Sequence, residues 1–223
     1  MIRAVLFDFD DTLGDRERYA YAFFKDIIEE NTDITDLLEK EAVLQDLMLW
    51  DEHGNIHKTH ITDMLKKKYG ITLPYTDFKS YWNEHLWEYT VAKKGAAETL
   101  ELLSKDYRLG IITNGPSAAQ RNKLRQSGLD VFFREENVIV SGDYDYAKPD
   151  GRLFETAAQR LGVNLNECVF VGDIFTNDVY GALKSGMKAV WIWNGNRSCS
   201  LDIPVIHEIY ELTDVLKTWF SVN

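Results

Sequence analysis

The chain opens with Arg3-Ala4-Val5-Leu6-Phe7-Asp8-Phe9-Asp10-Asp11-Thr12, where an apolar run gives way to acidic residues. Such a run is typical of a strand buried on both faces of a parallel sheet. Four similar runs follow, at 109–112, 137–140, 169–171 and 189–193. Helical patterns lie among them at 96–105, 117–127, 151–161 and 176–184, and a last one spans 208–219. This alternation predicts an α/β fold with a doubly wound, mostly parallel, Rossmann-like sheet.

The composition is that of a globular protein. With 223 residues, 45% of them hydrophobic, the chain can bury a sizeable core. Its formal net charge of -11 argues against a broad surface for nucleic acid or anionic membranes, because such surfaces depend on Lys and Arg. No uncharged apolar run approaches the roughly 20 residues of a membrane helix, and the N-terminus lacks the features of a secretory signal. We therefore expect a cytoplasmic protein without nucleic-acid or membrane partners.

Residues 15–93 break the alternation. This stretch contains no strand-like run but several helical patterns, at 16–30, 37–49, 59–69 and 77–89. It predicts an all-helical domain inserted into an α/β core formed by residues 1–14 and 94–223. The insert is rich in aromatic residues, which either form its own core or line a ligand site where a base could stack.

The acidic residues after the first run are the first candidate site. Residues i and i+2 of a strand face the same side, so Asp8 and Asp10 are expected to project together, opposite Phe7 and Phe9. Two neighbouring carboxylates resist joint ionisation unless a cation lies between them. The pair therefore predicts either a metal site or an acid/base pair.

Three later segments add further polar groups: Thr113-Asn114-Gly115, Lys148-Pro149-Asp150, and Gly172-Asp173 with Asn177-Asp178. Parallel α/β sheets bind ligands at the carboxyl ends of their strands, so these segments are expected to converge. Thr113 and Asn114 stand at a helix entrance, where N–H groups and a hydroxyl can bind an anion. Lys148 is either a solvated lysine or a charge aimed at a phosphate. Asp173 is expected beside Asp8 and Asp10 if their strands are neighbours, and three carboxylates of this kind offer the oxygen-only ligands that suit Mg²⁺.

In this order the four motifs resemble the haloacid dehalogenase superfamily of phosphotransferases. The similarity covers the α/β core, and the insert lies where members with a helical cap domain carry it. The resemblance implies that Asp8 is the nucleophile and Asp10 the acid/base. It implies substrate-phosphate binding by Thr113, Asn114 and Lys148, and metal binding by Asp8, Asp10, Asp173 and Asp178.

The predicted function is that of a Mg²⁺-dependent phosphatase, which hydrolyses a small phosphomonoester through an aspartyl-phosphate. A phosphomutase acting on a sugar phosphate remains an alternative, because it uses the same site and both acids. A haloacid dehalogenase is less favoured, because it needs neither a metal cluster nor an acid at position 10. A receiver-type switch also binds Mg²⁺ with clustered aspartates, but its phosphorylated Asp lies on a later strand and it has no large helical insert.

The substrate is expected to be a small phosphorylated metabolite. Residues 109–115, with 117–118 and 124–128, look like the nucleoside 5′-monophosphatase branch of the capped phosphatases. This similarity lies in a structural segment and implies a nucleoside 5′-monophosphate as one substrate. Neither the residues that select the substrate nor the oligomeric state follows from the sequence.

Overall fold

The α/β core contains one parallel sheet. The computed structural model describes residues 1–193, 195 and 199–220. Its strands are β1 (Ala4–Phe7), β2 (Arg108–Thr113), β3 (Val138–Val140), β4 (Cys168–Gly172), β5 (Lys188–Ile192) and β6 (Val205–Ile206). They pair in the order β3-β2-β1-β4-β5-β6, and every pairing is parallel. The predicted fold class is confirmed; β6 was not predicted, because two residues are too few for a recognisable run.

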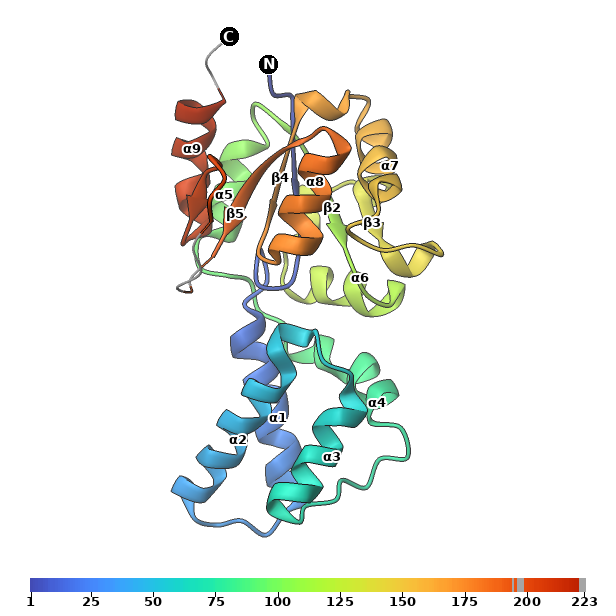
Figure 1. Cartoon of the computed structure of the whole chain (residues 1–223), viewed down its shortest axis with the longest axis vertical. Coiled ribbons are helices and arrows are strands. Elements are labelled where there is room, and N and C mark those ends of the chain that lie inside the picture. The colour runs from blue at the N-terminus through green and yellow to red at the C-terminus, as the bar shows by residue number, and fades with distance from the viewer. Residues whose placement is uncertain (194, 196–198, 221–223) are drawn as a thin grey trace. The chain divides into compact units, whose positions relative to one another are not determined.

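Helices cover both faces of this sheet (Figure 1). They are α5 (Ala96–Leu103), α6 (Ser117–Gln126), α7 (Gly151–Leu161), α8 (Tyr180–Ser185) and α9 (Leu212–Trp219). Alternate residues of β1 enter two separate cores. Val5 and Phe7 pack with residues of α5, α6 and α9, whereas Ala4 and Leu6 pack with residues of α7 and α8. Because both faces of β1 are buried, its residues are apolar without interruption.

Two predicted helices of the core begin with a turn that is not α-helical. The pattern at 176–184 starts with a single π-helical turn, Phe175–Val179, before α8, and the pattern at 208–219 starts with a 3₁₀ turn, Ile209–Glu211, before α9. The wide π turn contains Asp178, whose carboxylate accepts a hydrogen bond from the backbone N–H of Ile174 at 2.9 Å. π turns of this kind are frequent at functional sites.

The second compact unit is helical. The chain divides into one unit of residues 1–15 and 92–223 and another of residues 16–91, close to the predicted insert at 15–93. The helical unit contains α1 (Arg16–Asn31), α2 (Leu37–Asp51), α3 (Lys58–Tyr69) and α4 (Phe78–His85). The helix predicted at 77–89 ends at His85 and continues as a 3₁₀ turn, Leu86–Tyr89.

Aromatic side chains form the core of the helical unit. Tyr19, Phe23, Phe24, Phe78 and Trp82 are all buried in one apolar cluster. Phe23 and Trp82 meet edge to face, with ring centroids 5.0 Å apart, a favourable geometry for aromatic pairs. Along the described part of the chain, no helix is both long enough and apolar enough to cross a membrane.

Candidate active site

Three carboxylates meet at the carboxyl ends of two neighbouring strands. Asp8 follows β1 and Asp173 follows β4, and these strands pair in parallel with Phe7 opposite Val171. Asp178 joins them from the π turn. One carboxylate oxygen from each of the three lies within 4.8 Å of the others, and all three side chains are buried. The structure thus brings together three of the four acids predicted as metal ligands.

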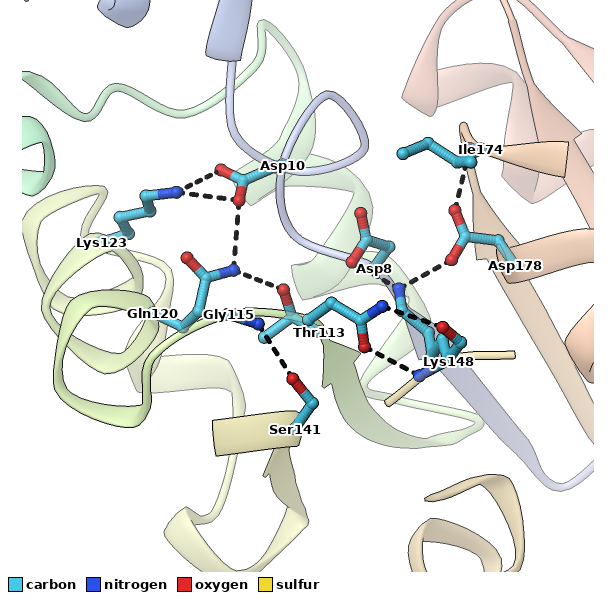
Figure 2. A network of polar contacts seen from close by, with 11 residues as sticks. Asp8, Asp10, Thr113, Gly115, Gln120, Lys123, Ser141, Lys148, Ile174 and Asp178 are labelled. Carbon is cyan, nitrogen blue, oxygen red and sulfur yellow. Dashed lines mark hydrogen bonds and ion pairs between the residues drawn. The ribbon is translucent and has the colours of Figure 1, made fainter. Parts of the chain in front are cut away.

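Lys148 is the cation of this group. Its Nζ donates to Asp8 Oδ1 and to Asp178 Oδ1, each at 2.7 Å, and its side chain is only 3% exposed (Figure 2). The side chain of Asn114 forms hydrogen bonds with both the backbone N–H and the backbone carbonyl of Lys148. Asn114 Oδ1 accepts from the Lys148 N–H at 2.9 Å, and Asn114 Nδ2 donates to the Lys148 carbonyl at 3.1 Å. The amide of Asn114, predicted to contact phosphate, therefore fixes the lysine in place.

Burial and crowding determine the charges of the group. Burial raises the pKa of Asp8 to about 7; Lys148 opposes this effect, and Asp178 and Asp10 add to it. Burial also raises the pKa of Asp173 well above its ordinary value, with further repulsion from Asp8 and Asp178. Burial by itself lowers the pKa of Lys148. The negative charges of Asp178 and Asp8 outweigh this effect, so the net result is a raised pKa. A site with three acids and one lysine favours an additional cation.

The donor set fits a hard divalent ion. Within the described ranges, Asp173 Oδ1 is buried and has no hydrogen-bond partner, and such an atom is costly unless it binds something. Three carboxylates offer the oxygen-only ligation that Mg²⁺ prefers, completed by water and substrate oxygens. Asp8, Asp173 and Asp178 are therefore the residues that could hold Mg²⁺.

Asp10 is not part of this acidic group. β1 ends at Phe7, and the chain then turns, with Asp11 in the left-handed region at φ 57°. The strand alternation that would place Asp8 and Asp10 side by side thus does not extend to Asp10. Both oxygens of the Asp10 carboxylate instead bond to Lys123 Nζ, at 2.9 and 2.8 Å (Figure 2). The Asp10 carboxylate thus lies outside the group of Asp8, Asp173 and Asp178, and its predicted roles as metal ligand and acid/base stay predictions.

Thr113 lies at the end of β2, where its hydroxyl is buried. Its Oγ1 accepts a hydrogen bond from Gln120 Nε2 at 2.5 Å. The next loop is held by the Gly115 N–H, which donates to Ser141 Oγ at 3.0 Å. A hydroxyl that accepts from one partner keeps its own proton to donate to another. Thr113 is therefore suited to bind an oxyanion.

Sequence reasoning missed Gln120, Lys123 and Ser141. Gln120 and Lys123 are three residues apart on α6, so they lie on one face of the helix. That face also buries Ala119 and Leu124. Polar residues at buried positions of an amphipathic helix, just after a strand-end motif, are the signal that could have indicated Gln120 and Lys123; Ser141 begins a 3₁₀ turn after β3 and carries no such signal.

The fold and the site define a class of protein: an α/β protein with a doubly wound parallel sheet and a buried group of carboxylates at the carboxyl ends of its strands. A family model described as haloacid dehalogenase-like hydrolase matches residues 2–186, and the chain belongs to this family. The family resemblance noted from the motifs is thereby confirmed.

Relatives agree with this assignment. The chain is 30% identical to the glyceraldehyde 3-phosphate phosphatase of Methanothermobacter thermautotrophicus, over 97% of this chain and 100% of that protein. It is 26% identical to the N-acylneuraminate-9-phosphatase of Mus musculus, over 97% and 92% of the two chains. The magnesium-bound structure of the HAD hydrolase YfnB of Bacillus subtilis is 26% identical, with a TM-score of 0.72 and coverage of 96% and 98%. The prediction of a HAD-like phosphatase, a phosphoric monoester hydrolase, is confirmed.

Gly172 offers a first prediction about this site. A methyl group there would lie 2.5 Å from Cβ and Cγ of Asp178, so Gly172→Ala must displace that acid. We expect the variant to lose about 1–3 kcal/mol of stability from overpacking and about 10²-fold in phosphatase activity. Thermal melting and phosphate release measure the two effects.

Gly151→Ala is the matched control for this substitution. Its added methyl would meet only the Ser185 hydroxyl, at 3.3 Å, and alanine favours the helix that starts at Gly151. We expect this control to keep its activity. Wild-type activity and stability in Gly172→Ala would show that Asp178 is not held as described.

Proposed function

We propose that the chain is a Mg²⁺-dependent phosphatase that hydrolyses a small phosphomonoester through an aspartyl-phosphate on Asp8. The observation that carries this proposal is the position of Asp8, buried between the Lys148 ammonium and the acids Asp173 and Asp178. When bound to these acids, Mg²⁺ supplies positive charge that offsets their repulsion and that of the substrate phosphate.

The first half of the proposed reaction transfers the phosphoryl group to the enzyme. An oxygen of the Asp8 carboxylate attacks phosphorus, and the bond from phosphorus to the alcohol oxygen breaks. Asp10 donates a proton to that oxygen as it departs, so that the alcohol leaves neutral. The Lys148 ammonium and the Thr113 hydroxyl bind phosphoryl oxygens, where fixed donors stabilise the developing charge.

The second half releases phosphate. Asp10, now a carboxylate, accepts a proton from a water molecule as the water attacks phosphorus. The bond from phosphorus to Asp8 breaks, which restores the Asp8 carboxylate. A phosphomutase would instead return the phosphoryl group to a second hydroxyl of the substrate. The phosphatase names of the relatives favour the hydrolase.

For the substrate we propose a small phosphorylated carbohydrate, with glyceraldehyde 3-phosphate as the first candidate. The support comes from the relatives that act as glyceraldehyde 3-phosphate phosphatases. The alternative of a nucleoside 5′-monophosphate came from the resemblance of residues 109–115, 117–118 and 124–128 to that branch, and the aromatic residues of the insert offered a place where a base could stack. Because many of these residues pack into the core of the helical unit, their abundance needs no stacked base to explain it.

A substrate panel tests this proposal. Glyceraldehyde 3-phosphate, glucose 1-phosphate, N-acylneuraminate 9-phosphate and nucleoside 5′-monophosphates are assayed for inorganic phosphate, with Mg²⁺ and with EDTA. We expect release only with Mg²⁺, and kcat/KM for glyceraldehyde 3-phosphate at least about tenfold above that for the nucleotides. Full turnover in EDTA would refute the metal dependence. An isomerised sugar phosphate as the main product would identify a mutase.

A further inference from the structure

A polar network joins helix α6 to the proposed acid/base residue. Lys123 Nζ contacts both oxygens of Asp10 at nearly equal distances, 2.9 and 2.8 Å. The Lys123 side chain is only 8% exposed, against 23% for Asp10. A carboxylate held by both oxygens cannot rotate freely, and a buried ammonium is less screened than a surface one. The contact therefore fixes the direction in which Asp10 presents its oxygens.

Gln120 connects the Asp10 carboxylate to Thr113, which is proposed to bind the substrate phosphate. Its Nε2 donates to Asp10 Oδ2 at 3.1 Å and to Thr113 Oγ1 at 2.5 Å, which uses both of its hydrogens (Figure 2). Gly115 leaves space for this side chain, because a methyl group there would lie 3.1 Å from Gln120 Cγ. One amide thus sets the position of Asp10 relative to Thr113.

We propose that Lys123 and Gln120 are positioning residues that hold the Asp10 carboxylate where it can transfer protons to the leaving group and from water. This inference rests on the proposed function, in which Asp10 performs both transfers. Lys123 and Gln120 touch neither phosphorus nor the departing oxygen in this scheme; they act through Asp10. A displacement of about 1 Å in a catalytic group can cost about 10²-fold in rate.

The alternative is that the buried ion pair only stabilises the fold. A stability role predicts a lower melting temperature and the same loss of activity for every substrate. A positioning role predicts a loss that depends on how much proton transfer each step needs. An alkyl phosphate releases a basic alkoxide that needs the proton from Asp10, whereas p-nitrophenyl phosphate releases a stable phenolate that does not.

The experiment compares Lys123→Met with the wild type on glycerol 3-phosphate and p-nitrophenyl phosphate. With the alkyl ester we expect kcat to fall by about 10²-fold, with KM little changed. With p-nitrophenyl phosphate we expect a burst of one nitrophenolate per enzyme, followed by slow turnover, because water attack on the aspartyl-phosphate still needs Asp10. Gln120→Leu is expected to show the same pattern more weakly, and Lys123→Arg to restore part of the rate.

Arg125→Met is the matched control, since it removes an exposed cation from the same helix, where Arg125 bonds to Asn122. We expect it to behave as the wild type. Equal losses on both substrates without a burst, or wild-type kinetics in Lys123→Met, would overturn the inference. If Lys123→Met does not fold, as judged by circular dichroism, Gln120→Leu and Lys123→Arg decide in the same assay. Activity that survives in Asp8→Asn would instead refute the proposed function itself.

Discussion

Asp8→Asn is expected to lower phosphatase activity by at least about 10⁴-fold, the scale seen when a nucleophile is removed. An amide oxygen is a poor nucleophile, so the aspartyl-phosphate cannot form. Phosphate release from glyceraldehyde 3-phosphate with Mg²⁺ measures the loss. Asp106→Asn, the same chemical change at an exposed residue, is the matched control and should keep full activity.

The Asp8→Asn variant should remain folded. Burial already raises the pKa of Asp8 to about 7, so the metal-free protein accommodates a neutral side chain at this position. Lys148 also keeps Asp178 as an ion-pair partner at 2.7 Å. We expect a melting temperature in EDTA no lower than that of the wild type. Wild-type turnover by this variant would contradict the role of Asp8, and an unfolded variant would contradict our account of its environment.

Lys148→Ala is expected to have the second-largest effect. It removes the ammonium that bonds both Asp8 and Asp178. Activity should fall by about 10²–10³-fold, as when one preorganised donor is lost. Stability should fall by about 3–5 kcal/mol, because the buried carboxylates lose their partner. Phosphate release and denaturant unfolding measure the two losses.

The pH dependence of Lys148→Ala has a definite sign. The folded-state pKa of Asp8 is raised above its ordinary value even with Lys148 present, and it rises further without the lysine. A raised carboxyl pKa leaves the folded state stable at low pH and destabilises it as pH rises through that pKa. The stability deficit of the variant in EDTA should therefore be larger at pH 8 than at pH 5. Lys184→Ala, at an exposed residue of α8, is the control. A deficit that shrinks as pH rises would contradict the proposed charge balance.

The sequence was sufficient to predict the fold and the meeting of Asp8 and Asp173, for a physical reason. A strand buried on both faces must be apolar throughout. The sequence therefore shows β1 and β4 as apolar runs, which are followed directly by Asp8 and Asp173. Parallel pairing then brings those ends together, whatever the length of the insert between them.

The features that escaped prediction depend on local geometry. The prediction for Asp10 assumed that the strand continues, but the chain turns at Asp11 and the carboxylate contacts α6. Lys123 and Gln120 interact with a residue more than a hundred positions away, and no local pattern encodes that contact. The hydrogen bonds by which the Asn114 side chain positions Lys148 likewise join two loops that meet only in the folded chain.

The most direct test of the central claim is to trap the phosphorylated residue. The enzyme is quenched during turnover with Mg²⁺ and treated with borohydride, which reduces an aspartyl-phosphate to homoserine, and the peptides are sequenced by mass spectrometry. We predict homoserine at position 8 in the wild type and none in Asp8→Asn. Homoserine at another aspartate, or unmodified Asp8 in an enzyme trapped during active turnover, would contradict the account.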